Sequence, residues 1–566
     1  MQNKVLDQNY RLSKNFYHSD VILQHYLNTR LSVRSLAGFS ETLLETGEKA
    51  AGELCRLSRL ADKFGPELKK RNFYGENIDE IVFHPAYTKM LEIAVASQML
   101  RLKWEPDLRN RFDGERHKMG FAAGFLFSMS ESGLYCPLCM TDGVALLIDK
   151  YCNEVDKERL LPRIYTEIAS DLYSGAMFLT EKSGGSDVGA NLVTATHFKD
   201  DLWQLNGEKW FCSNANAEII FVLARTNPDI PGTKGLGIFL LEPKLPDGTS
   251  NGMELLRLKE KLGTRSMASG EYILKNAIAK LVGGETEGFK IMTDMINLSR
   301  LYNSVAAIAG MRRAIVEVYQ FLSFRKSFGK NALEHPLIRV KLHELGAIYL
   351  GNFYMSWRTI EAMDAADCGD REEAELLRVL TPMTKKSTAE TSVYAVREAM
   401  ELMGGMGYIE DGVMPKIMRD MMVLPIWEGA GNIMILDLLR ASFKSDGLGI
   451  LFEELESEFD NAADSDLENS EKWDKISTRL LELKEHILLV QESETEMMET
   501  SAKPAFESLS KFFQLACLLR YYDEDSAVWI RPAIDYYCKM LLHNNEFDLK
   551  IPPTIETVKD LLGWDF

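Results

Sequence analysis

Apolar positions recur every three or four residues over the first part of the chain, as they do in amphipathic helices. The stretch PAYTKMLEIAVASQMLRLKW, residues 85–104, shows this spacing. Between residues 172 and 284 the period falls to two, and short runs such as EIIFVLART and GLGIFLLEP alternate with turn residues. Asn206 and Gly207 interrupt the run LWQLNGEKWFCS, and this dipeptide predicts a hairpin turn.

The helical period returns after residue 284. Leu298, Leu301, Val305 and Ile308 form one stripe. KSDGLG, residues 444–449, is a predicted linker, and a second apolar stripe follows it: Trp473, Ile476, Leu480, Leu483, Ile487 and Val490. This spacing predicts a helix that packs along a partner helix or lies in the core of a helical bundle. We prefer the helical bundle. The pattern predicts an α+β protein of four parts: a helical domain (1–171), a β domain (172–284), a helical bundle (285–445) and an additional acidic helical domain (446–566).

Charge is concentrated at one end of the chain. The whole sequence carries 65 Lys+Arg and 84 Asp+Glu, a net charge of −19. Residues 446–566 hold 27 acidic and 11 basic residues, a net charge of −16, and such a segment repels phosphate backbones. We find no uncharged apolar run of about 18 residues and no apolar signal region near the first residues, so we expect a cytoplasmic protein without a membrane span.

Eight cysteines are scattered without regular spacing and do not suggest a disulfide framework. Cys136 and Cys139 have CxxC spacing, but we find no second ligand pair that would complete a zinc site. A redox pair is expected at the start of a helix after a strand, whereas this pair lies within a helical stretch. We therefore expect reduced structural thiols.

A Gly-rich loop opens the predicted β domain in the stretch MFLTEKSGGSDVGAN, residues 177–191. It has neither the lysine of a phosphate-binding P-loop nor the GxGxxG pattern of a dinucleotide turn. Its amides and the hydroxyls of Thr180, Ser183 and Ser186 suit a neutral heterocycle or a distant pyrophosphate. Taken alone, the loop is equally compatible with a surface turn.

A second candidate is the acid of LPIWEGAGNIMILDLLR, residues 424–440. Glu428 lies between Trp427 and Gly429, where partial desolvation would raise its pKa toward that of a useful base. Gly429 leaves room for a substrate. The alternative is that Glu428 is an acidic helix N-cap, favoured by the helix dipole.

Two further stretches offer contacts to a dinucleotide. FRKSFGK, residues 324–330, places the guanidinium of Arg325 where it can pair with a pyrophosphate. ELMGGMGY, residues 401–408, contains Gly404 and Gly405, which allow close approach of the backbone. Either stretch can instead be a helix end with a surface cation.

In this order, and with an α-β-α layout, the motifs resemble those of the acyl-CoA dehydrogenase superfamily of flavoproteins over roughly residues 115–441. The resemblance implies FAD as cofactor, with the Gly-rich loop at the flavin ring edge and the CoA side of the substrate. KWFCSNAN is similar to the strand along the other flavin edge, with Trp210 at the family's tryptophan and the usual hydroxyl on Cys212 or Ser213.

RKSFG and ELMGGMG resemble segments that reach the FAD of a neighbouring subunit, with Arg325 and Ser327 near the pyrophosphate and Glu401 in place of the commoner glutamine. The resemblance thus implies these cofactor-binding residues: Met177, Leu179, Thr180, Gly185, Ser186, Trp210, Phe211, Cys212, Ser213, Arg325, Ser327, Phe328, Glu401, Gly404, Gly405, Ala430 and Asn432.

Glu428 matches the family's catalytic carboxylate. Some members carry that base on an earlier helix, where the present chain has about Ser299, which cannot serve. Ser186, Arg300 and Gly429 match substrate-contacting positions. We therefore expect FAD-dependent α,β-dehydrogenation of an acyl-CoA thioester, with electrons leaving to an electron-transfer flavoprotein or another acceptor.

TEKSGGSDVGAN, RLKEKLGTRSMAS and IWEGAGNIMILDLLR, with the extra C-terminal region, are most similar to the AidB-type (alkylation-response) branch and its acyl-CoA-binding animal relatives. The resemblance implies a homotetramer. Some members bind DNA through a basic C-terminal domain, but the acidic region here gives no reason to expect it. The alternative functions are an acyl-CoA-binding or sequestering flavoprotein with little turnover and a DNA-associated protective flavoprotein, against which the charge argues.

Overall fold

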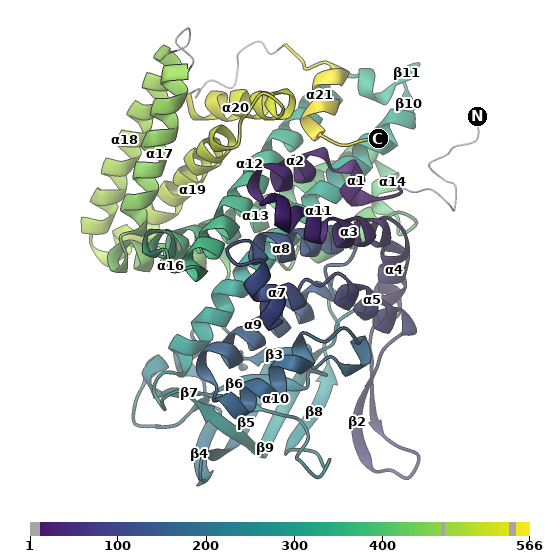
Figure 1. Ribbon diagram of the computed structural model, residues 1–566, viewed down its shortest axis with the longest axis vertical. Helices are drawn as coiled ribbons and strands as arrows, with labels where there is room; N and C mark the ends of the chain where they lie inside the picture. Colours follow the sequence, from purple (N-terminus) through teal and green to yellow (C-terminus); the bar gives the residue numbers. More distant parts are fainter. Residues whose placement is uncertain (1–11, 466–469, 543–550) are drawn as a thin grey trace. The chain divides into compact units, whose positions relative to one another are not determined.

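The computed structural model describes residues 12–465, 470–542 and 551–566 of the chain (Figure 1). These residues form two units, which we describe separately. The β unit comprises residues 53–112 and 130–302, and the helical unit comprises residues up to 52, 113–129 and 303 onward. The predicted α+β fold is confirmed, whereas the predicted four-domain boundaries stay a prediction.

A barrel-like sheet dominates the β unit. The strands of the unit are β1 (Glu67–Arg71), β2 (Asn77–Val82), β3 (Gly175–Phe178), β4 (Thr194–Lys199), β5 (Leu202–Ser213), β6 (Ile219–Arg225), β7 (Leu236–Leu241), β8 (Met253–Leu258) and β9 (Ser269–Val282). The strand order is β3-β6-β4-β5-β9-β7, with β8 on β9 and a further β6–β7 pairing that closes the sheet. Its inward side chains, among them Trp203, Cys212 and Phe239, form one hydrophobic core.

Helices complete the β unit. They are α4 (Cys55–Lys63), α5 (Pro85–Ala96), α6 (Arg101–Trp104), α7 (Pro106–Arg111), α9 (Tyr135–Tyr151) and α10 (Glu154–Ile164). Both cysteines of the CxxC pair, Cys136 and Cys139, are buried within α9. The long helix α11 (Gly288–Phe324) contributes residues to both units.

The hairpin predicted at Asn206-Gly207 is wrong. Strand β5 runs without a turn from Leu202 to Ser213. Gly207 has φ +138 and lies at a register shift against β9, so the dipeptide forms a bulge in a continuous strand. The turn of the β4–β5 hairpin lies earlier, near Asp200, which has φ +54.

The N-terminal stretch also contains strands that the helical period did not predict. Strands β1 and β2 pair antiparallel, and Asn72 forms the turn between them by accepting hydrogen bonds from the N–H groups of Tyr74 and Glu76. Their burial alternates between exposed and half-buried positions. Leu68 and Ile81 pack on the core of the sheet, but neither face is apolar throughout, so the hydrophobic pattern carried little signal for this hairpin.

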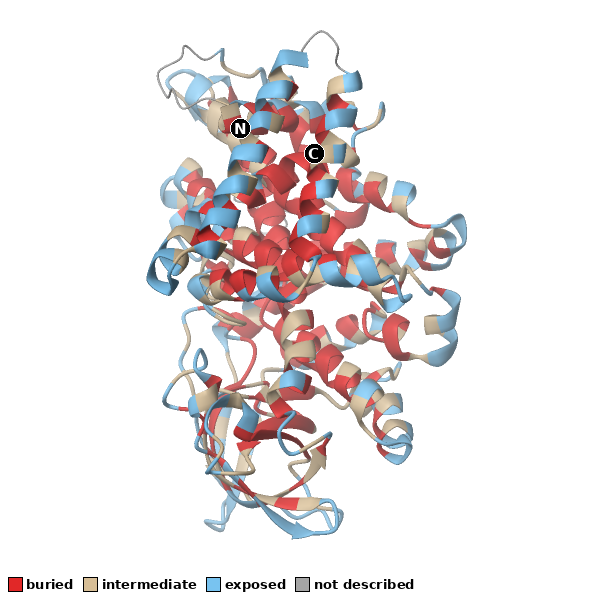
Figure 2. Ribbon diagram, turned by 90° about the vertical axis from the view of Figure 1, so that its left-hand side faces the viewer, coloured by how far each residue is buried: buried red, intermediate tan, exposed pale blue. Residues whose placement is uncertain are grey.

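The helical unit is a bundle around long central helices. Its elements are α1 (Phe16–Ser19), α2 (Val21–Arg30), α3 (Val33–Lys49), α8 (Arg116–Ser128), α12 (Pro336–Asp367), α13 (Arg371–Met403), α14 (Gly405–Tyr408), α15 (Met414–Met421), α16 (Gly431–Lys444), α17 (Gly447–Ser465), α18 (Ser470–Glu492), α19 (Thr495–Arg520), α20 (Ala527–Leu542), α21 (Ile555–Leu562) and the short strands β10 (Lys326–Ser327) and β11 (Lys330–Asn331). Figure 2 shows that buried residues concentrate along the inner faces of these helices.

Both predicted helical stripes are buried, except that Leu483 is half-buried. The linker between α16 and α17 is shorter than expected and consists of Ser445 and Asp446, because α16 ends at Lys444 and α17 begins at Gly447. Helices α17, α18 and α19 pack on one another, and α19 also packs on α12 (Figure 1). Arg358 of α12 ties this region to the bundle through bidentate ion pairs with Glu373 and Glu454.

Buried hydrogen bonds of Arg312 join segments near the two ends of the described chain. The Arg312 guanidinium of α11 is fully buried and donates two 2.8 Å hydrogen bonds to the Asp20 carboxylate. It also donates to the carbonyls of Leu562 and Gly563 at the end of α21. Burial alone would lower the pKa of Arg312, but Asp20 outweighs it and the pKa is raised. Arg312 thus stays charged and holds α21 against the N-terminal helices.

Candidate active site

The turn that carries Glu428 follows α15 and is held by hydrogen bonds at its start. The N–H of Trp427 donates to the carbonyl of Val423 at 3.1 Å. The Asn303 side chain donates to the carbonyl of Leu424 at 3.0 Å. The buried Nε1 of Trp427 has no hydrogen-bond partner among the described residues. A donor is therefore left for a group that the described part of the chain does not supply.

Glu428 and Gly429 both adopt left-handed backbone conformations, with φ +58 and +102. Such a conformation is uncommon for a residue with a side chain and is found at functional sites. Helix α16 begins at Gly431 with Ala430 as its N-cap residue. Glu428 lies two positions earlier, so the alternative that it caps this helix is wrong.

A buried lysine supports this turn from α13. The Lys385 side chain is 1% exposed, and its Nζ donates to the carbonyl of Gly429 at 2.6 Å. Glu428 itself is half-buried. The arrangement presents a carboxylate on a constrained turn, flanked by the indole of Trp427 and the small Gly429, as a general base requires.

In the β unit, the Gly-rich loop leaves the sheet after β3. The Trp210 N–H of β5 donates to the Thr180 carbonyl at 2.9 Å, and the Asn191 side chain donates to the Leu179 carbonyl. A Cβ on Gly185 would lie 2.8 Å from the Thr180 hydroxyl oxygen, so a larger residue here would displace the Thr180 side chain. Met177, Leu179 and Thr180 are half-buried, whereas Gly185 and Ser186 are exposed.

A fully buried ion pair fixes the start of the loop to β5. The Lys209 Nζ lies 2.8 Å from the Glu181 carboxylate, with side chains 0% and 6% exposed. Glu181 also accepts hydrogen bonds from the N–H groups of Leu192 and Val193. Burial lowers the pKa of Lys209, and Glu181 only partly opposes that shift. Both residues lie within the motifs TEKSGGSDVGAN and KWFCSNAN, but no pattern in the sequence indicates that they form a pair.

Strand β5 presents alternate residues of KWFCS to different surroundings. Cys212 is 0% exposed within the hydrophobic core, and burial raises the pKa of its thiol. Ser213 is half-buried and Phe211 is exposed. Lys259 lies 3.7 Å from the centre of the Trp210 ring. Of the two positions left open for the family's hydroxyl, the core position of Cys212 favours Ser213.

In the helical unit, Arg325 and the Gly-rich turn come together. Arg325 Nη1 donates to the Met403 carbonyl at 3.2 Å, directly before Gly404. Gly404 has φ +62, and no described atom lies within 4 Å of a Cβ built on Gly404 or Gly405. The RKSFG and ELMGGMG motifs thus form one cationic site with open space beside its glycines.

The other predicted residues of this unit are mostly exposed. Ser327 is bonded to His335 at 3.0 Å, and Phe328 at the β10–β11 turn has φ +50. Ala430 and Asn432 are exposed at the start of α16. Glu401 pairs with Arg397 at 2.5 Å. Arg397 also pairs with Glu398, so the acid that departs from the family's pattern shares its exposed cation with a second carboxylate.

Family models match the described regions in the expected order. The "Adaptive response protein AidB N-terminal domain" matches residues 8–168, the "Acyl-CoA dehydrogenase, middle domain" matches 176–277, and the "Acyl-CoA dehydrogenase, C-terminal domain" matches 286–443. The putative acyl-CoA dehydrogenase AidB of Escherichia coli is 33% identical over 73% of this chain and 76% of its own length. The chain belongs to the acyl-CoA dehydrogenase family.

Longer relatives extend the likeness over the C-terminal region. Acyl-CoA dehydrogenase family member 11 of Caenorhabditis elegans is 28% identical over 93% of this chain and 88% of its own length. The structure of C. elegans ACDH-11 in complex with C11-CoA matches with a TM-score of 0.87 and 25% identity over 96% of this chain and 94% of its own. The Bd2924 apo-form matches with a TM-score of 0.82 and 29% identity over 91% and 99%. The AidB-type identification is confirmed.

FAD is the cofactor of this acyl-CoA dehydrogenase family member. Several residues fit a polar ring system or a dinucleotide. Next to Ser213, the side-chain oxygens of Asn214 and Asn216 are buried without a hydrogen-bond partner in the described chain. The open Gly404–Gly405 turn beside Arg325 suits a phosphate-bearing group.

Arg300 and Ser299 lie on the part of α11 that belongs to the β unit. Both are buried, and Arg300 Nη1 donates to the Asn297 side chain at 3.0 Å. The Ser299 hydroxyl donates to the Ile296 carbonyl. Ser299 is bound to its own helix and offers no carboxylate, as the sequence indicated.

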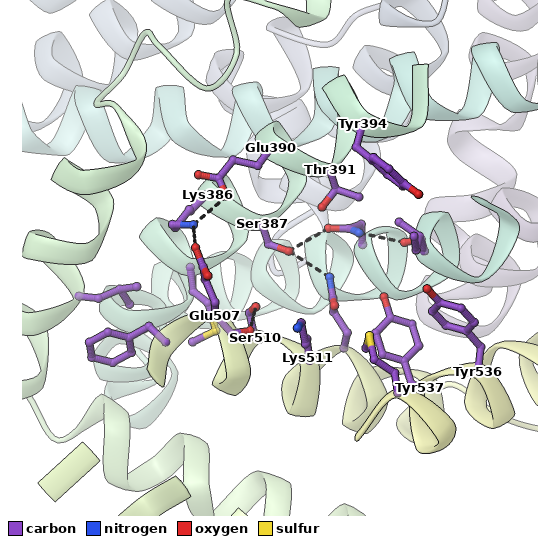
Figure 3. A pocket seen from close by; sticks show the side chains of 17 residues that line it. Lys386, Ser387, Glu390, Thr391, Tyr394, Glu507, Ser510, Lys511, Tyr536 and Tyr537 are labelled. Atoms are coloured by element: carbon purple, nitrogen blue, oxygen red, sulfur yellow. Dashed lines mark hydrogen bonds and ion pairs between the residues drawn. The ribbon is translucent and has the colours of Figure 1, made fainter. Parts of the chain in front are cut away.

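A groove of about 380 Å³ in the helical unit contains none of the predicted site residues (Figure 3). It lies among α12, α13, α16, α19 and α20. Its buried cation, Lys386, is paired at 2.7 Å with both Glu390 and Glu507. Ser387 is bonded to Asn352 and Gln514. Because these charged and polar groups satisfy one another, we do not assign the chemistry to this groove.

Among the described residues, no helix is both long and apolar enough to cross a membrane.

Proposed function

We propose that this member of the acyl-CoA dehydrogenase family catalyses FAD-dependent α,β-dehydrogenation of an acyl-CoA thioester with Glu428 as the base. The observation that carries the proposal is the constrained turn, in which Glu428 has φ +58 beside Gly429. Asn303 and the buried Lys385 anchor the turn from two helices. A base on such a turn is presented in one orientation, which general base catalysis requires.

The reaction divides between the chain and its cofactor. Glu428 takes the proton from the carbon next to the thioester carbonyl, and the electrons of that C–H bond form the new double bond. FAD, when bound, would supply the acceptor for the hydride that leaves the β-carbon. Negative charge builds up on the thioester oxygen as the proton leaves, and backbone N–H donors of the turn stabilise it. Arg300 and Gly429 contact the substrate in this scheme, as does Ser186 on its CoA side.

We further propose two sets of FAD contacts. The flavin ring edge is held by residues of the β unit, with the hydroxyl of Ser213 in the role left open between it and Cys212. The dinucleotide of a neighbouring subunit is held at the cationic site of Arg325, Gly404 and Gly405, whose contact through the Met403 carbonyl supports this assignment. Ala430 and Asn432 contribute from the start of α16.

Assembly into a homotetramer belongs to the same proposal. Phe328 is 96% exposed and Tyr408 is 80% exposed, and each lies within a few residues of Arg325 or Gly404. Large apolar side chains left in water beside a cofactor-binding site are typical of an interface. Light scattering of the FAD-loaded protein is expected to give the mass of four chains. A monomer that retains FAD would contradict this assembly.

The variant Glu428→Gln tests the base. The amide is isosteric but cannot accept the proton, so bleaching of the flavin by acyl-CoA is expected to slow by about a hundredfold or more. FAD content and acyl-CoA affinity should stay close to those of the wild type. Glu453→Gln, a change of an exposed acid of α17 in the same unit, is the matched control. A Glu428→Gln variant that bleaches at the wild-type rate would refute the role.

Acyl-CoA binding with little turnover is the second candidate. The observation that favours it is that ACDH-11, similar over 96% of this chain, was solved in complex with C11-CoA. Tight binding of acyl-CoA without bleaching, under anaerobic conditions and for every chain length, would select this function. Glu428 would then be a pocket residue. The acidic C-terminal region leaves duplex DNA as the least favoured partner.

A further inference from the structure

Two neighbouring lysines of α13 are buried and point to different partners. Lys386 lies in the groove of Figure 3, paired with Glu390 and Glu507. Lys385 donates instead to the carbonyl of Gly429 at 2.6 Å. Burying an ammonium group is costly unless it is bonded, so the contact to the Gly429 carbonyl helps to offset the burial of Lys385, which is 1% exposed.

The Gly429 carbonyl belongs to the left-handed stretch that contains Glu428. The backbone of Glu428 is bracketed by two side-chain contacts, from Asn303 to the Leu424 carbonyl and from Lys385 to the Gly429 carbonyl. Both anchors come from long helices, α11 and α13, whose backbones are fixed by packing. Releasing one anchor frees the turn to relax from φ values that residues with side chains rarely adopt.

We propose that Lys385 is a positioning residue for Glu428. Its ammonium group holds the Gly429 carbonyl and thereby keeps the turn in the shape that presents the Glu428 carboxylate and the adjacent backbone donors. The inference rests on the proposed function, because it assigns Lys385 a part in the same reaction. Lys385 acts through Gly429 and does not itself take or give the substrate proton.

The kinetic consequence follows from how positioned groups work. A base and its backbone donors accelerate proton removal only while their geometry is fixed, and a displacement of about 1 Å can cost about a hundredfold in rate. Loss of the Lys385 contact should therefore slow the chemical step. Binding of the CoA portion does not depend on this turn and should change little.

The experiment compares Lys385→Met, Lys385→Arg and Lys386→Met with the wild type, all as FAD-loaded full-length protein. Methionine fills the volume of lysine without its charge, and arginine retains N–H donors for the Gly429 carbonyl. Lys386→Met is the matched control, because it breaks two ion pairs of an adjacent buried lysine and spares the contact to Gly429. Anaerobic stopped-flow bleaching gives the limiting rate and the apparent dissociation constant, and a melting curve reports stability.

Lys385→Met is expected to lower the limiting bleaching rate by about tenfold or more, with FAD content unchanged and the apparent dissociation constant within about threefold. Lys385→Arg should recover most of that rate. Lys386→Met should lower the melting temperature and leave the limiting rate near that of the wild type. If Lys385→Met does not fold, Lys385→Gln replaces it, because its shorter, uncharged side chain cannot reproduce the 2.6 Å contact.

A wild-type limiting rate in either folded variant without the ammonium group would overturn the inference. So would a loss of rate in Lys386→Met as large as that in Lys385→Met, since the effect would then track stability alone. Exchange of the substrate's α-hydrogen with deuterated water, followed by mass spectrometry, separates this failure from failure of the proposed function. A wild-type protein that neither exchanges nor bleaches contradicts the proposed function, and with it the role of Lys385.

Discussion

Breaking the buried pair between Glu181 and Lys209 should have unequal effects, depending on which partner is removed. In Lys209→Met, the Glu181 carboxylate keeps two backbone donors, the N–H groups of Leu192 and Val193. In Glu181→Gln, the Lys209 ammonium keeps, among the described residues, a 3.3 Å contact to the Leu179 carbonyl, with the new amide beside it. The second change should therefore cost more stability.

The magnitudes follow from the 2.8 Å separation of the two charges. At an effective dielectric of about 20, their attraction is about 6 kcal/mol before desolvation is subtracted. Removing one partner of a buried pair costs about 3–5 kcal/mol, and we expect Lys209→Met near the lower value. Glu181→Gln has a ceiling of about 5 kcal/mol, because at pH 7 a lysine of ordinary pKa can be deprotonated for that free energy.

That ceiling predicts a pH dependence for Glu181→Gln. Burial already lowers the pKa of Lys209 in the wild type, with Glu181 opposing the shift, so loss of Glu181 lowers the pKa further. The folded variant then loses the lysine proton at a lower pH than the unfolded chain, which binds the proton until about pH 10.4. Where the lysine is neutral in the folded variant and protonated in the unfolded chain, unfolding takes up a proton, and the free energy of unfolding rises with pH by up to about 1.4 kcal/mol per pH unit. Lys209→Met has no ammonium group at this position, so its free energy of unfolding should show no such rise with pH.

Urea unfolding at pH 7, 8 and 9, followed by circular dichroism and by flavin release, measures these differences. Lys182→Met is the matched control, because Lys182 and Glu208 form an exposed ion pair between the same two segments. Its loss should cost about 1 kcal/mol or less. A Glu181→Gln variant that loses less than about 1 kcal/mol, or whose loss is constant with pH, would refute the assignment of a charged buried pair.

Three further outcomes are expected. Asp20→Ala leaves Arg312 buried without its carboxylate and should lower the free energy of unfolding by about 3–5 kcal/mol, whereas Asp20→Leu combined with Arg312→Met should lose much less in the same urea titration. Burial raises the pKa of Asp367, but hydrogen bonds and charge from His117 and Arg116 lower it to about 2, so stability from this group is present above its ordinary 3.8 and is lost as the pH falls through about 2. Melting temperatures of Asp367→Asn should consequently change less than those of the wild type between these pH values. Residues 446–566 should not bind duplex DNA at about 50 mM salt, because they carry a net charge of −16; salt-sensitive retention of the isolated 446–566 fragment on duplex DNA would contradict this.

The order of the motifs could be predicted from the sequence, and so could the grouping of two of them within the helical unit. Arg325 and Gly404 are far apart in the chain, yet both were expected at one dinucleotide site, and the Arg325 contact to Met403 brings them together. The flanking residues Trp427 and Gly429 indicate Glu428 as the candidate base, and its left-handed backbone conformation agrees with a functional role. Glycine pairs, an arginine and an acid beside small residues indicate a candidate site from the sequence alone, because recognising them does not require knowledge of the packing.

Strand register was less predictable. Alternation could not decide between Cys212 and Ser213, because β5 shifts its register against β9 between Lys209 and Cys212. A bulge adds one residue to one strand and exchanges the faces that follow. The same effect explains why Asn206-Gly207, a strong turn signal, lies inside a continuous strand.

Buried charges were the least predictable part of the site. Lys385 and Lys209 read as surface residues, since lysine is rarely buried unless it is paired. Their partners, Gly429 and Glu181, lie 44 and 28 positions away in the sequence. Burial of such a side chain depends on a contact that only the folded chain supplies, and one sequence carries no pattern that reveals it.

The most direct test of the proposed function is anaerobic mixing of the wild-type, FAD-loaded protein with a series of acyl-CoA thioesters of increasing chain length. We expect the flavin to bleach with at least one of them, and mass spectrometry to find the matching enoyl-CoA, lighter by the two hydrogens removed from the α- and β-carbons. Acyl-CoA that binds throughout the series without bleaching the flavin or losing hydrogen would contradict dehydrogenation by this protein.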